Sequence, residues 1–204
     1  PLVFWVLDLW PDSLEAVGVV RSERTLKLVG WLVSYIYKRC DLVLGQSKSF
    51  ISHIRKYAGH DRVAYFPGWA ESVFSVDQFK SPNSRSEKAQ FNVVFAGNVG
   101  VSQDFPTVLK AMEHLKENKN ICWTIVGDGR MFDWLADEIG NRGLKNVVRL
   151  AGRYPMEDMP KFFQDADALL VNLKDDPIFS MTIPGKLQAY LVSGKPILAL
   201  LNGE

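Results

Sequence analysis

Short apolar runs alternate with longer segments of helical period along most of the chain, and this alternation limits the fold more than any other feature. A run that is apolar at every position predicts a strand buried on both faces, as in a parallel sheet. The intervening helices would then cover both faces of that sheet. We therefore expect an α/β fold with doubly wound, Rossmann-like parallel sheets. The predicted strands are Leu2–Leu7, Leu42–Gly45, Val63–Phe66, Asn92–Ala96, Cys122–Val126, Val147–Leu150, Ala168–Asn172 and Ile197–Leu200. The predicted helices are Glu23–Lys38, Lys48–Tyr57, Phe105–Glu117, Met131–Asn141, Glu157–Gln164 and Gly185–Val192.

Residues that commonly begin or end helices support these boundaries. Ser47 and Asp104 stand directly before predicted helices, where a side-chain oxygen can accept a hydrogen bond from a backbone N–H. Gly140, Gly143 and Gly194 fall where helices are expected to stop, because glycine readily adopts the left-handed conformation of a helix end.

One polar stretch interrupts the alternation. The sequence KSPNSRSEKAQ, residues 80–90, has neither helical nor strand period, which is typical of a linker or a long surface loop. It would separate a partial N-terminal Rossmann-like unit at residues 1–79 from a nearly complete C-terminal one at residues 91–204. We interpret the opening run PLVFWVLDL as an interior strand, and we expect both ends to be cut from a longer protein.

Composition restricts the class of partner. Hydrophobic residues make up 47% of the 204 residues, charged residues 23%, and the formal net charge is +1, which describes a soluble globular chain. No block of like charges and no basic stripe with aromatic residues is present, so the pattern of a nucleic-acid-binding protein is missing. Cys40 and Cys122 lack metal or redox spacing and suit buried thiols in a reducing compartment. The opening run has no basic region or cleavage site of a signal peptide, and we expect a cytoplasmic protein.

His53, His60 and His114 have no obvious partners and are interpreted as surface residues.

Four motifs stand where predicted strands end and helices begin, the edge at which open α/β sheets bind ligands. Taken singly, each of the first three is explained at least as well by a tight turn or by solvated side chains. The motifs are Gly97-Asn98-Val99-Gly100, Gly127-Asp128-Gly129, Gly152-Arg153-Tyr154 and Ile183-Pro184-Gly185-Lys186.

The fourth motif has the strongest local chemistry. Pro184 near the first helical turn loses no hydrogen bond there, and Gly185 keeps the backbone open to a ligand. The start of a helix offers N–H groups without helical partners and about half a positive charge. With Lys186 beside it, the motif predicts a site for an anion, above all a phosphate.

In this order, the motifs resemble the nucleotide-sugar-binding domain of the retaining GT-B glycosyltransferases, a family that includes sucrose synthase and many bacterial polysaccharide enzymes. The matching segments are FAGNVG, TIVGDG, VRLAGRYPMEDMPKFFQDADALLVNL and IPGKLQAYLVSGKPIL, within residues 91–201. The upstream segment FWVLDLWPDSLEAVGVV is similar to the acceptor-side region of bacterial N-acetylfucosaminyltransferase-like proteins, which build surface polysaccharides. The resemblance covers nearly the whole chain.

The resemblance implies transfer of a sugar, with retention, from a UDP-sugar to a lipid-linked or saccharide acceptor. Lys186 and exposed N–H groups from Thr182 to Gly185 would hold the leaving diphosphate, with no metal ion and no other cofactor. Asp8 would orient the acceptor hydroxyl or accept its proton. The donor-binding residues implied are Gly97, Asn98, Gly100, Gly127, Arg153, Tyr154, Thr182, Ile183, Gly185 and Gln188.

Two departures from the family leave other functions open. The family commonly has two glutamates beside the donor, and this chain has Met181 and Ala189 at those positions. Asn98, Gln103 and Asp104 stand where many relatives place cations for the diphosphate. One alternative is a non-hydrolysing UDP-N-acetylglucosamine 2-epimerase, which shares the fold but needs a set of acidic and histidine residues that we do not find. The other is a nucleotide-sugar-binding module without activity, which fits the missing glutamates.

The helix predicted at Glu23–Lys38 raises the question of a membrane, because it is apolar and aromatic on most sides and has basic flanks. It is too short for a span, which needs about 20 apolar residues. It would either pack under a sheet, the interpretation that we favour, or lie on the inner face of the cytoplasmic membrane beside a polyprenyl-linked acceptor.

The adjacent Asp175 and Asp176 are the acidic pair nearest to the fourth motif. We interpret them as capping the loop before Pro177 rather than as magnesium ligands.

Overall fold

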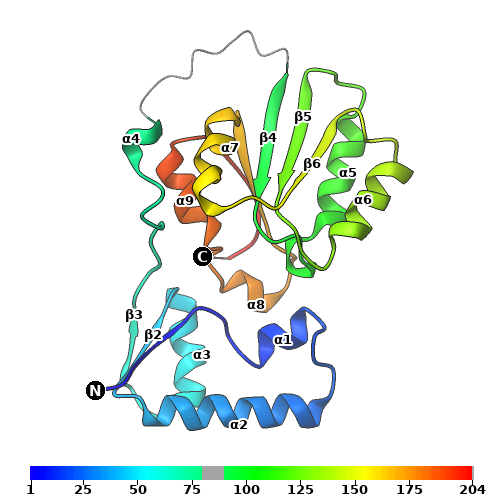
Figure 1. Cartoon of the computed structure of the whole chain (residues 1–204). Coiled ribbons are helices and arrows are strands. Elements are labelled where there is room, and N and C mark those ends of the chain that lie inside the picture. The colour runs from blue at the N-terminus through cyan, green and yellow to red at the C-terminus, as the bar shows by residue number, and fades with distance from the viewer. Residues whose placement is uncertain (80–89, 204) are drawn as a thin grey trace. The chain divides into compact units, whose positions relative to one another are not determined.

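The computed structural model describes residues 1–79 and 90–203. Within these residues the chain forms one parallel sheet of three strands and another of five, with helices around them (Figure 1). The predicted α/β fold class is confirmed. Residues 80–89 of the predicted linker lie outside the described residues.

The chain divides into two compact units. The first unit comprises Pro1–Gly68 and Lys174–Pro184, with the last residues from Leu201. The second unit comprises Trp69–Leu173 and Gly185–Leu200. The fourth motif therefore spans a division between units, at the bond from Pro184 to Gly185.

The first unit is a three-stranded parallel sheet with helices against it. Its strands are β1 (Val3–Val6), β2 (Leu42–Gly45) and β3 (Val63–Tyr65), in that order across the sheet. Helix α3 lies against α2, β2 and β3, and its residues Phe50, Ile54 and Ala58 recur at helical spacing and are buried. The helices are α1 (Asp12–Ala16), α2 (Glu23–Arg39), α3 (Lys48–Ala58) and α8 (Pro177–Ser180).

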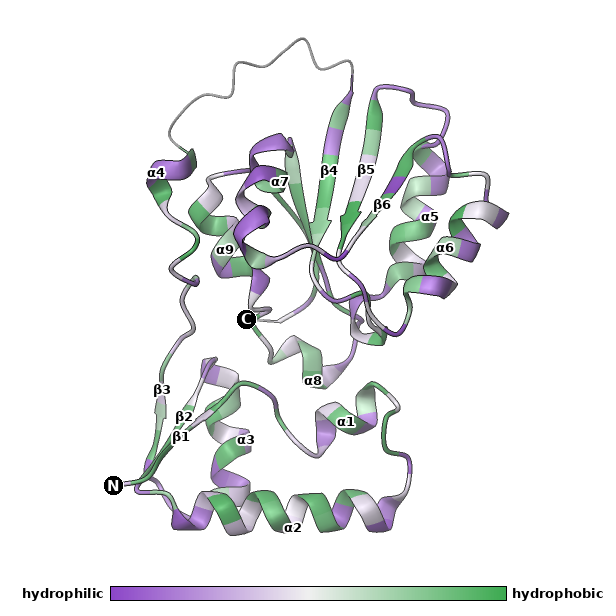
Figure 2. Ribbon diagram, in the orientation of Figure 1, coloured by the Kyte–Doolittle hydropathy of each residue, from purple (hydrophilic) through white to green (hydrophobic). Residues whose placement is uncertain are grey.

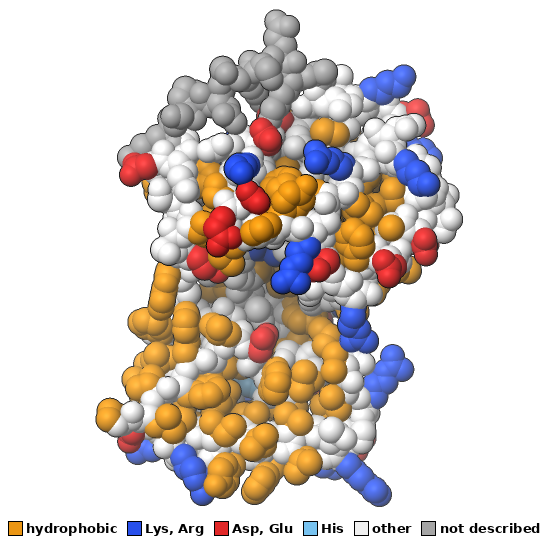
Figure 3. Space-filling model, viewed as in Figure 1, with side chains coloured by type: hydrophobic (Ala, Val, Ile, Leu, Met, Phe, Trp, Pro, Cys, Tyr) orange, Lys and Arg blue, Asp and Glu red, His pale blue; other side chains and the backbone are white. Residues whose placement is uncertain are grey.

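Among the described residues strand β1 pairs with β2 on one side, and the side chains of Val3 and Phe4 are 52% and 38% exposed. Its interior position stays a prediction. Burial of α2, the interpretation favoured from the sequence, holds for only part of that helix. Val33 and Tyr37 are buried, whereas Trp31 is 63% exposed. Figure 3 shows hydrophobic side chains gathered on this unit. No helix among the described residues is long and apolar enough to cross a membrane.

The second unit holds a five-stranded parallel sheet in the order β6-β5-β4-β7-β8. Strand order reverses between β4 and β7, the kind of position at which doubly wound sheets bind ligands. The strands are β4 (Phe91–Ala96), β5 (Ile121–Val126), β6 (Val148–Gly152), β7 (Ala168–Asn172) and β8 (Ile197–Leu200). The helices are α4 (Val76–Phe79), α5 (Phe105–Leu115), α6 (Phe132–Asn141), α7 (Met159–Asp165) and α9 (Lys186–Ser193).

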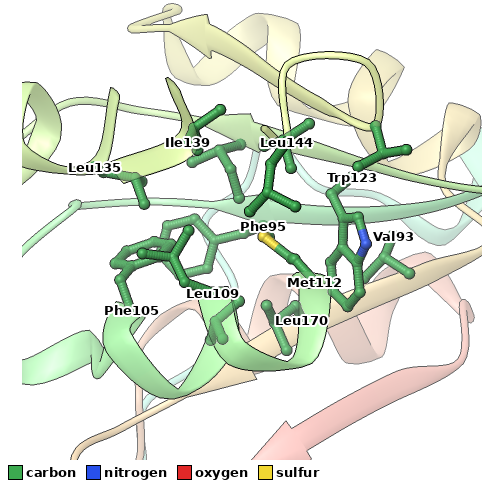
Figure 4. Packing of buried hydrophobic residues seen from close by; sticks show 14 of the residues in the cluster. Val93, Phe95, Phe105, Leu109, Met112, Trp123, Leu135, Ile139, Leu144 and Leu170 are labelled. Atoms are coloured by element: carbon green, nitrogen blue, oxygen red, sulfur yellow. The ribbon is translucent and has the colours of Figure 1, made fainter. Parts of the chain in front are cut away.

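Both faces of this sheet are covered, as the apolar strands predict (Figures 1 and 2). On one face Phe95 of β4 packs with Leu109 of α5 and Leu135 of α6, and all three are fully buried (Figure 4). Burial of each such side chain contributes about 1.5–3 kcal/mol. On the other face lies α9, whose Tyr190 hydroxyl hydrogen-bonds to both the backbone N–H and the carbonyl of Ala96 at 2.9 and 3.2 Å. Strand β8, at the sheet edge, is mostly exposed instead.

Helix ends follow the predicted signals with two exceptions. The Ser47 side chain accepts a hydrogen bond from the N–H three residues on, and Gly143 and Gly194 have positive φ just beyond α6 and α9. Asp104 precedes α5, but its side chain makes no capping hydrogen bond in the described structure. Gly140 does not end a helix, because α6 continues to Asn141. The short helices α1, α4 and α8 are not predicted, since a helix of five residues or fewer shows no period.

Two of the histidines are not simple surface residues, as the sequence led us to expect. His53 Nε2 lies 3.1 Å from Oδ2 of Asp12, with only 12% of the His53 side chain exposed. His60 Nε2 lies 3.1 Å from the carbonyl oxygen of Tyr37. The partners belong to other helices, so local sequence spacing does not reveal them.

Candidate functional site

A cavity of about 660 Å³ opens at the carboxyl edge of the second unit's sheet. Ala96 and Gly97 at the end of β4 form part of its lining, and Arg153 and Tyr154 after β6 form another part. Residues of α7 and the first turn of α9 complete the lining. Parallel sheets bind their ligands at this edge.

Lys186, the first residue of α9, places its ammonium group across the end of β4. Its Nζ donates a hydrogen bond to Oε1 of Gln103 at 2.9 Å and lies 3.7 Å from the centroid of the Phe95 ring. Burial lowers the pKa of Lys186 to about 7, because removal from water disfavours the charged form. An anion in the cavity would favour that form again, so the site suits a negatively charged ligand.

Gly97 is required by the position of Lys186. Its φ is +143°, and a Cβ atom added there would lie 3.0 Å from Lys186 Nζ. A side chain at this position would displace the ammonium group or strain the backbone. The first and fourth motifs, distant in the sequence, thus form one arrangement.

Gly127 and Gly129 serve a different purpose, since they allow two loops to lie side by side. A Cβ atom at Gly127 would collide with the carbonyl oxygen of Gly97, and one at Gly129 would lie 2.6 Å from that of Val99. The Val99 N–H donates to the carbonyl of Asp128 at 2.7 Å. These contacts favour the structural-turn interpretation of the second motif. A donor-binding role for Gly127, which is not part of the cavity lining, stays a prediction.

Arg153 and Tyr154 lie at the rim of the cavity, where a ligand can reach them. Arg153 Nη1 is 3.7 Å from Oδ2 of Asp128, but both side chains are largely exposed, and such pairs contribute at most about 1 kcal/mol. The Tyr154 ring packs edge-on against Phe162 with 4.8 Å between centroids and is 41% exposed.

The structure places the other candidate residues of the second unit near this lining. Gly185 lines the cavity directly. Asn98 and Gly100 belong to the loop that follows Gly97, and Gln188 lies in α9. These three are not part of the lining, and their binding roles stay predictions.

The structure places Asp8, Thr182 and Ile183 in the first unit. Asp8 lines a second cavity of about 330 Å³ together with residues of β1 and α2. The prediction that the Thr182 N–H is exposed is wrong, because this group donates to the carbonyl of Phe179 at 3.0 Å.

Asp176 caps α8, as the sequence predicts for the acidic pair. Its Oδ1 accepts a hydrogen bond from the Ile178 N–H at 3.0 Å. Asp175 Oδ1 accepts a hydrogen bond from the side chain of Asn202 at 2.8 Å.

Three residues of functional interest escape the sequence motifs. Glu71 and Phe74 line the cavity, although they come from the segment that precedes α4. Asn172, 1% exposed, has no hydrogen-bond partner for its side-chain amide among the described residues. Val94 of β4 pairs with Leu169 of β7, and three residues further along stand Gly97 and Asn172. Only the polar residue at the end of an otherwise apolar strand could have indicated Asn172.

The fold and this site define an α/β protein with a cavity at the carboxyl edge of a doubly wound sheet, lined by the buried cationic residue Lys186. Residues 76–182, just over half of the chain, match the family model of glycosyl transferases group 1, and the chain belongs to that family. The comparison with curated protein sequences gives no match.

Solved glycosyltransferase structures have the same fold and confirm its GT-B type. The structure of HepE from Anabaena in complex with UDP and glucose aligns with 100% of this chain and with 53% of the HepE chain. The TM-score is 0.72 and the sequence identity 16%. WaaG, a glycosyltransferase involved in lipopolysaccharide biosynthesis, aligns with 97% of this chain and with 55% of the WaaG chain, with a TM-score of 0.69 and 15% sequence identity. The pneumococcal O-GlcNAc transferase GtfA in complex with UDP and GlcNAc aligns with 83% of this chain and with 33% of the GtfA chain, with a TM-score of 0.59 and 18% sequence identity. The chain thus spans about half the length of HepE and WaaG.

Proposed function

We propose that the chain belongs to an enzyme that transfers a sugar, N-acetylated and with retention, from a UDP-sugar to a lipid-linked or saccharide acceptor. Its product would be a bacterial surface polysaccharide such as lipopolysaccharide or its O-antigen. The observation that carries the proposal is the Lys186 ammonium group beside Gly97, in the cavity of a group 1 glycosyltransferase. The UDP complexes of HepE and GtfA, the GlcNAc bound to GtfA and the pathway of WaaG support the choice of substrates.

Lys186 would act on the departure of the diphosphate. In the proposed reaction the bond between the sugar C1 and the β-phosphate oxygen breaks, and its electron pair leaves with UDP. The acceptor oxygen forms the new bond to C1, and its proton passes to a base. An ammonium group that is already in position where negative charge develops can lower the activation free energy by several kcal/mol. We propose Asp8 for orienting the acceptor hydroxyl or accepting its proton, and we propose that no metal ion is needed.

Isothermal titration calorimetry against UDP, GDP and ADP tests the donor site without an acceptor. We expect UDP to bind most tightly and the Lys186→Met variant to lose at least tenfold in affinity. Lys195→Met is the matched control, because Lys195 donates hydrogen bonds to the carbonyls of Gln164 and Ala166 and is not part of the cavity lining. Equal affinity of wild type and Lys186→Met would remove the basis of the proposal.

Incubation of the full-length protein with a UDP-N-acetyl sugar and a lipid-diphosphate acceptor tests the reaction. Transfer of the sugar, with the anomeric configuration read by NMR, supports the proposal. An epimerised sugar or an unchanged one identifies instead the isomerase or the inactive binding module, the latter consistent with Met181 and Ala189.

We also propose a cytoplasmic location with peripheral contact to the inner face of the membrane. Exposed Leu28 and Trp31 on α2, with Lys27 and Lys38 on the same helix, support it, since such helices bind at the bilayer interface. Flotation of the full-length protein with anionic liposomes tests this contact, and failure to float overturns it.

A further inference from the structure

The segment before α4 is held against the second unit by a chain of aromatic contacts. Phe74 stacks on Phe163 of α7 with 5.5 Å between centroids and planes 12° apart. Phe163 in turn meets the Tyr190 ring edge-on at 5.2 Å. Tyr190 is hydrogen-bonded to the backbone of Ala96, directly before Gly97. Aromatic pairs of this geometry contribute about 0.5–1.5 kcal/mol each beyond burial, so the segment has a defined position relative to the end of β4.

This anchoring fixes the backbone of Glu71. The Phe74 N–H donates to the Glu71 carbonyl at 2.9 Å, which closes a turn between the anchored ring and the glutamate. Glu71 lines the same cavity as Gly97 and Lys186. Its side chain is exposed, and we find no hydrogen bond or ion pair of its carboxylate among the described residues.

Helix α9 presents no carboxylate to the cavity. On that helix the lining residues are Lys186, a cation, Ala189, which is apolar, and Tyr190, whose hydroxyl is bonded to Ala96. Glu71 is the carboxylate among the described lining residues. A carboxylate repels a diphosphate but accepts strong hydrogen bonds from hydroxyl groups.

We propose that Glu71 recognises hydroxyl groups of the nucleotide-sugar donor, an inference that rests on the proposed function. The cations of the lining, Lys186 and Arg153, hold the diphosphate, and Glu71 accepts hydrogen bonds from the ribose or from the transferred sugar. Recognition of a donor hydroxyl thus comes from the segment that precedes α4, outside the motifs on the strand ends.

Calorimetry with three ligands tests this role. UDP, 2′,3′-dideoxy-UDP and UDP-N-acetylglucosamine are titrated into wild type, Glu71→Ala and the control Glu117→Gln, an exposed residue outside the cavity. Because a hydrogen bond to a charged group is lost, Glu71→Ala should bind UDP or UDP-N-acetylglucosamine about 10- to 100-fold more weakly. The exposed position of Glu71 predicts an unchanged Tm for the variant.

The ligands separate the outcomes. A loss for UDP that is absent for 2′,3′-dideoxy-UDP places the contact at the ribose, and a loss confined to UDP-N-acetylglucosamine places it at the sugar. Either result supports the proposal. Equal affinities of Glu71→Ala and wild type for all three ligands overturn it while the proposed function stands. Wild type that binds no uridine nucleotide overturns both.

Discussion

Replacing Lys186 by methionine should make the protein more stable at low pH. In the unfolded chain the amine has its ordinary pKa of 10.5, and in the folded protein burial lowers that pKa to about 7. Below pH 7 the ammonium group is charged in both states and the folded state carries the whole cost of desolvation. The interval between the two pKa values corresponds to a free energy on the order of 5 kcal/mol. Methionine has a similar length and carries no such cost.

Two favourable interactions of the lysine are absent from the variant, and their absence reduces this gain. Gln103 is left without the donor at 2.9 Å, which costs about 1–3 kcal/mol when an acceptor stays buried. The cation–π interaction with the Phe95 ring contributes about 0.5–2 kcal/mol in wild type. We therefore expect Lys186→Met to be more stable than wild type at pH 6 by about 0–3.5 kcal/mol.

The pH dependence separates this explanation from simple repacking. Between pH 7 and 10.5 the unfolded wild type binds one proton more than the folded one, so its stability rises with pH. The advantage of Lys186→Met should therefore fall by about 1.4 kcal/mol per pH unit from pH 7 to 9. Urea unfolding followed by circular dichroism at pH 6, 7, 8 and 9 measures it. A difference independent of pH, or a variant less stable than wild type at pH 6, would refute the reasoning.

Three further outcomes follow from the same site. The affinity for a UDP-sugar should fall up to tenfold per pH unit above pH 7, because Lys186 loses its proton while the charge of the ligand stays constant from pH 6 to 8.5. Calorimetry in two buffers should show that the protein takes up a proton when the UDP-sugar binds. Gly97→Ala should lower the free energy of unfolding by about 1–3 kcal/mol, because residue 97 has a positive φ. Gly140→Ala, inside α6, should raise the free energy of unfolding by about 0.5–1 kcal/mol. Urea unfolding measures both changes. Tyr190→Phe should cost about 1–3 kcal/mol by leaving backbone groups of Ala96 without their partner, and an unchanged Tm would contradict the two hydrogen bonds.

Most of the fold could be predicted because its signals are local. A buried parallel strand such as β7 is apolar at nearly every position, and its predicted bounds, Ala168–Asn172, are those observed. What local pattern does not carry is the position of a strand within its sheet. The run at β1 is as apolar as that at β7, yet within the described residues β1 pairs with one neighbouring strand and β7 with two. Edge or centre is decided by which strands lie beside it.

The residues of the candidate site likewise differ in whether local sequence reveals them. Lys186 and Gly97 follow from helix-start chemistry and from glycine at a strand end, and the structure brings them together. Glu71 could not be found, because its place in the cavity lining depends on tertiary packing. Asn172 is indicated in the sequence only as a polar residue at the end of an apolar strand. His53 shows the same limit, since its partner Asp12 belongs to a different helix.

Gln103 illustrates how a departure from a family pattern can belong to the site. From the sequence it stands where relatives place a cation, and in the structure its Oε1 accepts the hydrogen bond of Lys186 Nζ. A neutral acceptor positions the ammonium group without cancelling its charge, so that charge stays available to an anion. Gln103→Glu changes little but the charge, and the new carboxylate would pair with Lys186 and raise its pKa.

The glutamate variant should therefore bind UDP at least tenfold more weakly than wild type at pH 7, as measured by calorimetry, because the diphosphate must compete with a buried carboxylate. Gln103→Leu is the control, since it removes the hydrogen bond but adds no charge. It should lose less affinity than Gln103→Glu. If Gln103→Glu bound UDP as tightly as wild type, the Lys186 ammonium group would not be the cation that meets the diphosphate.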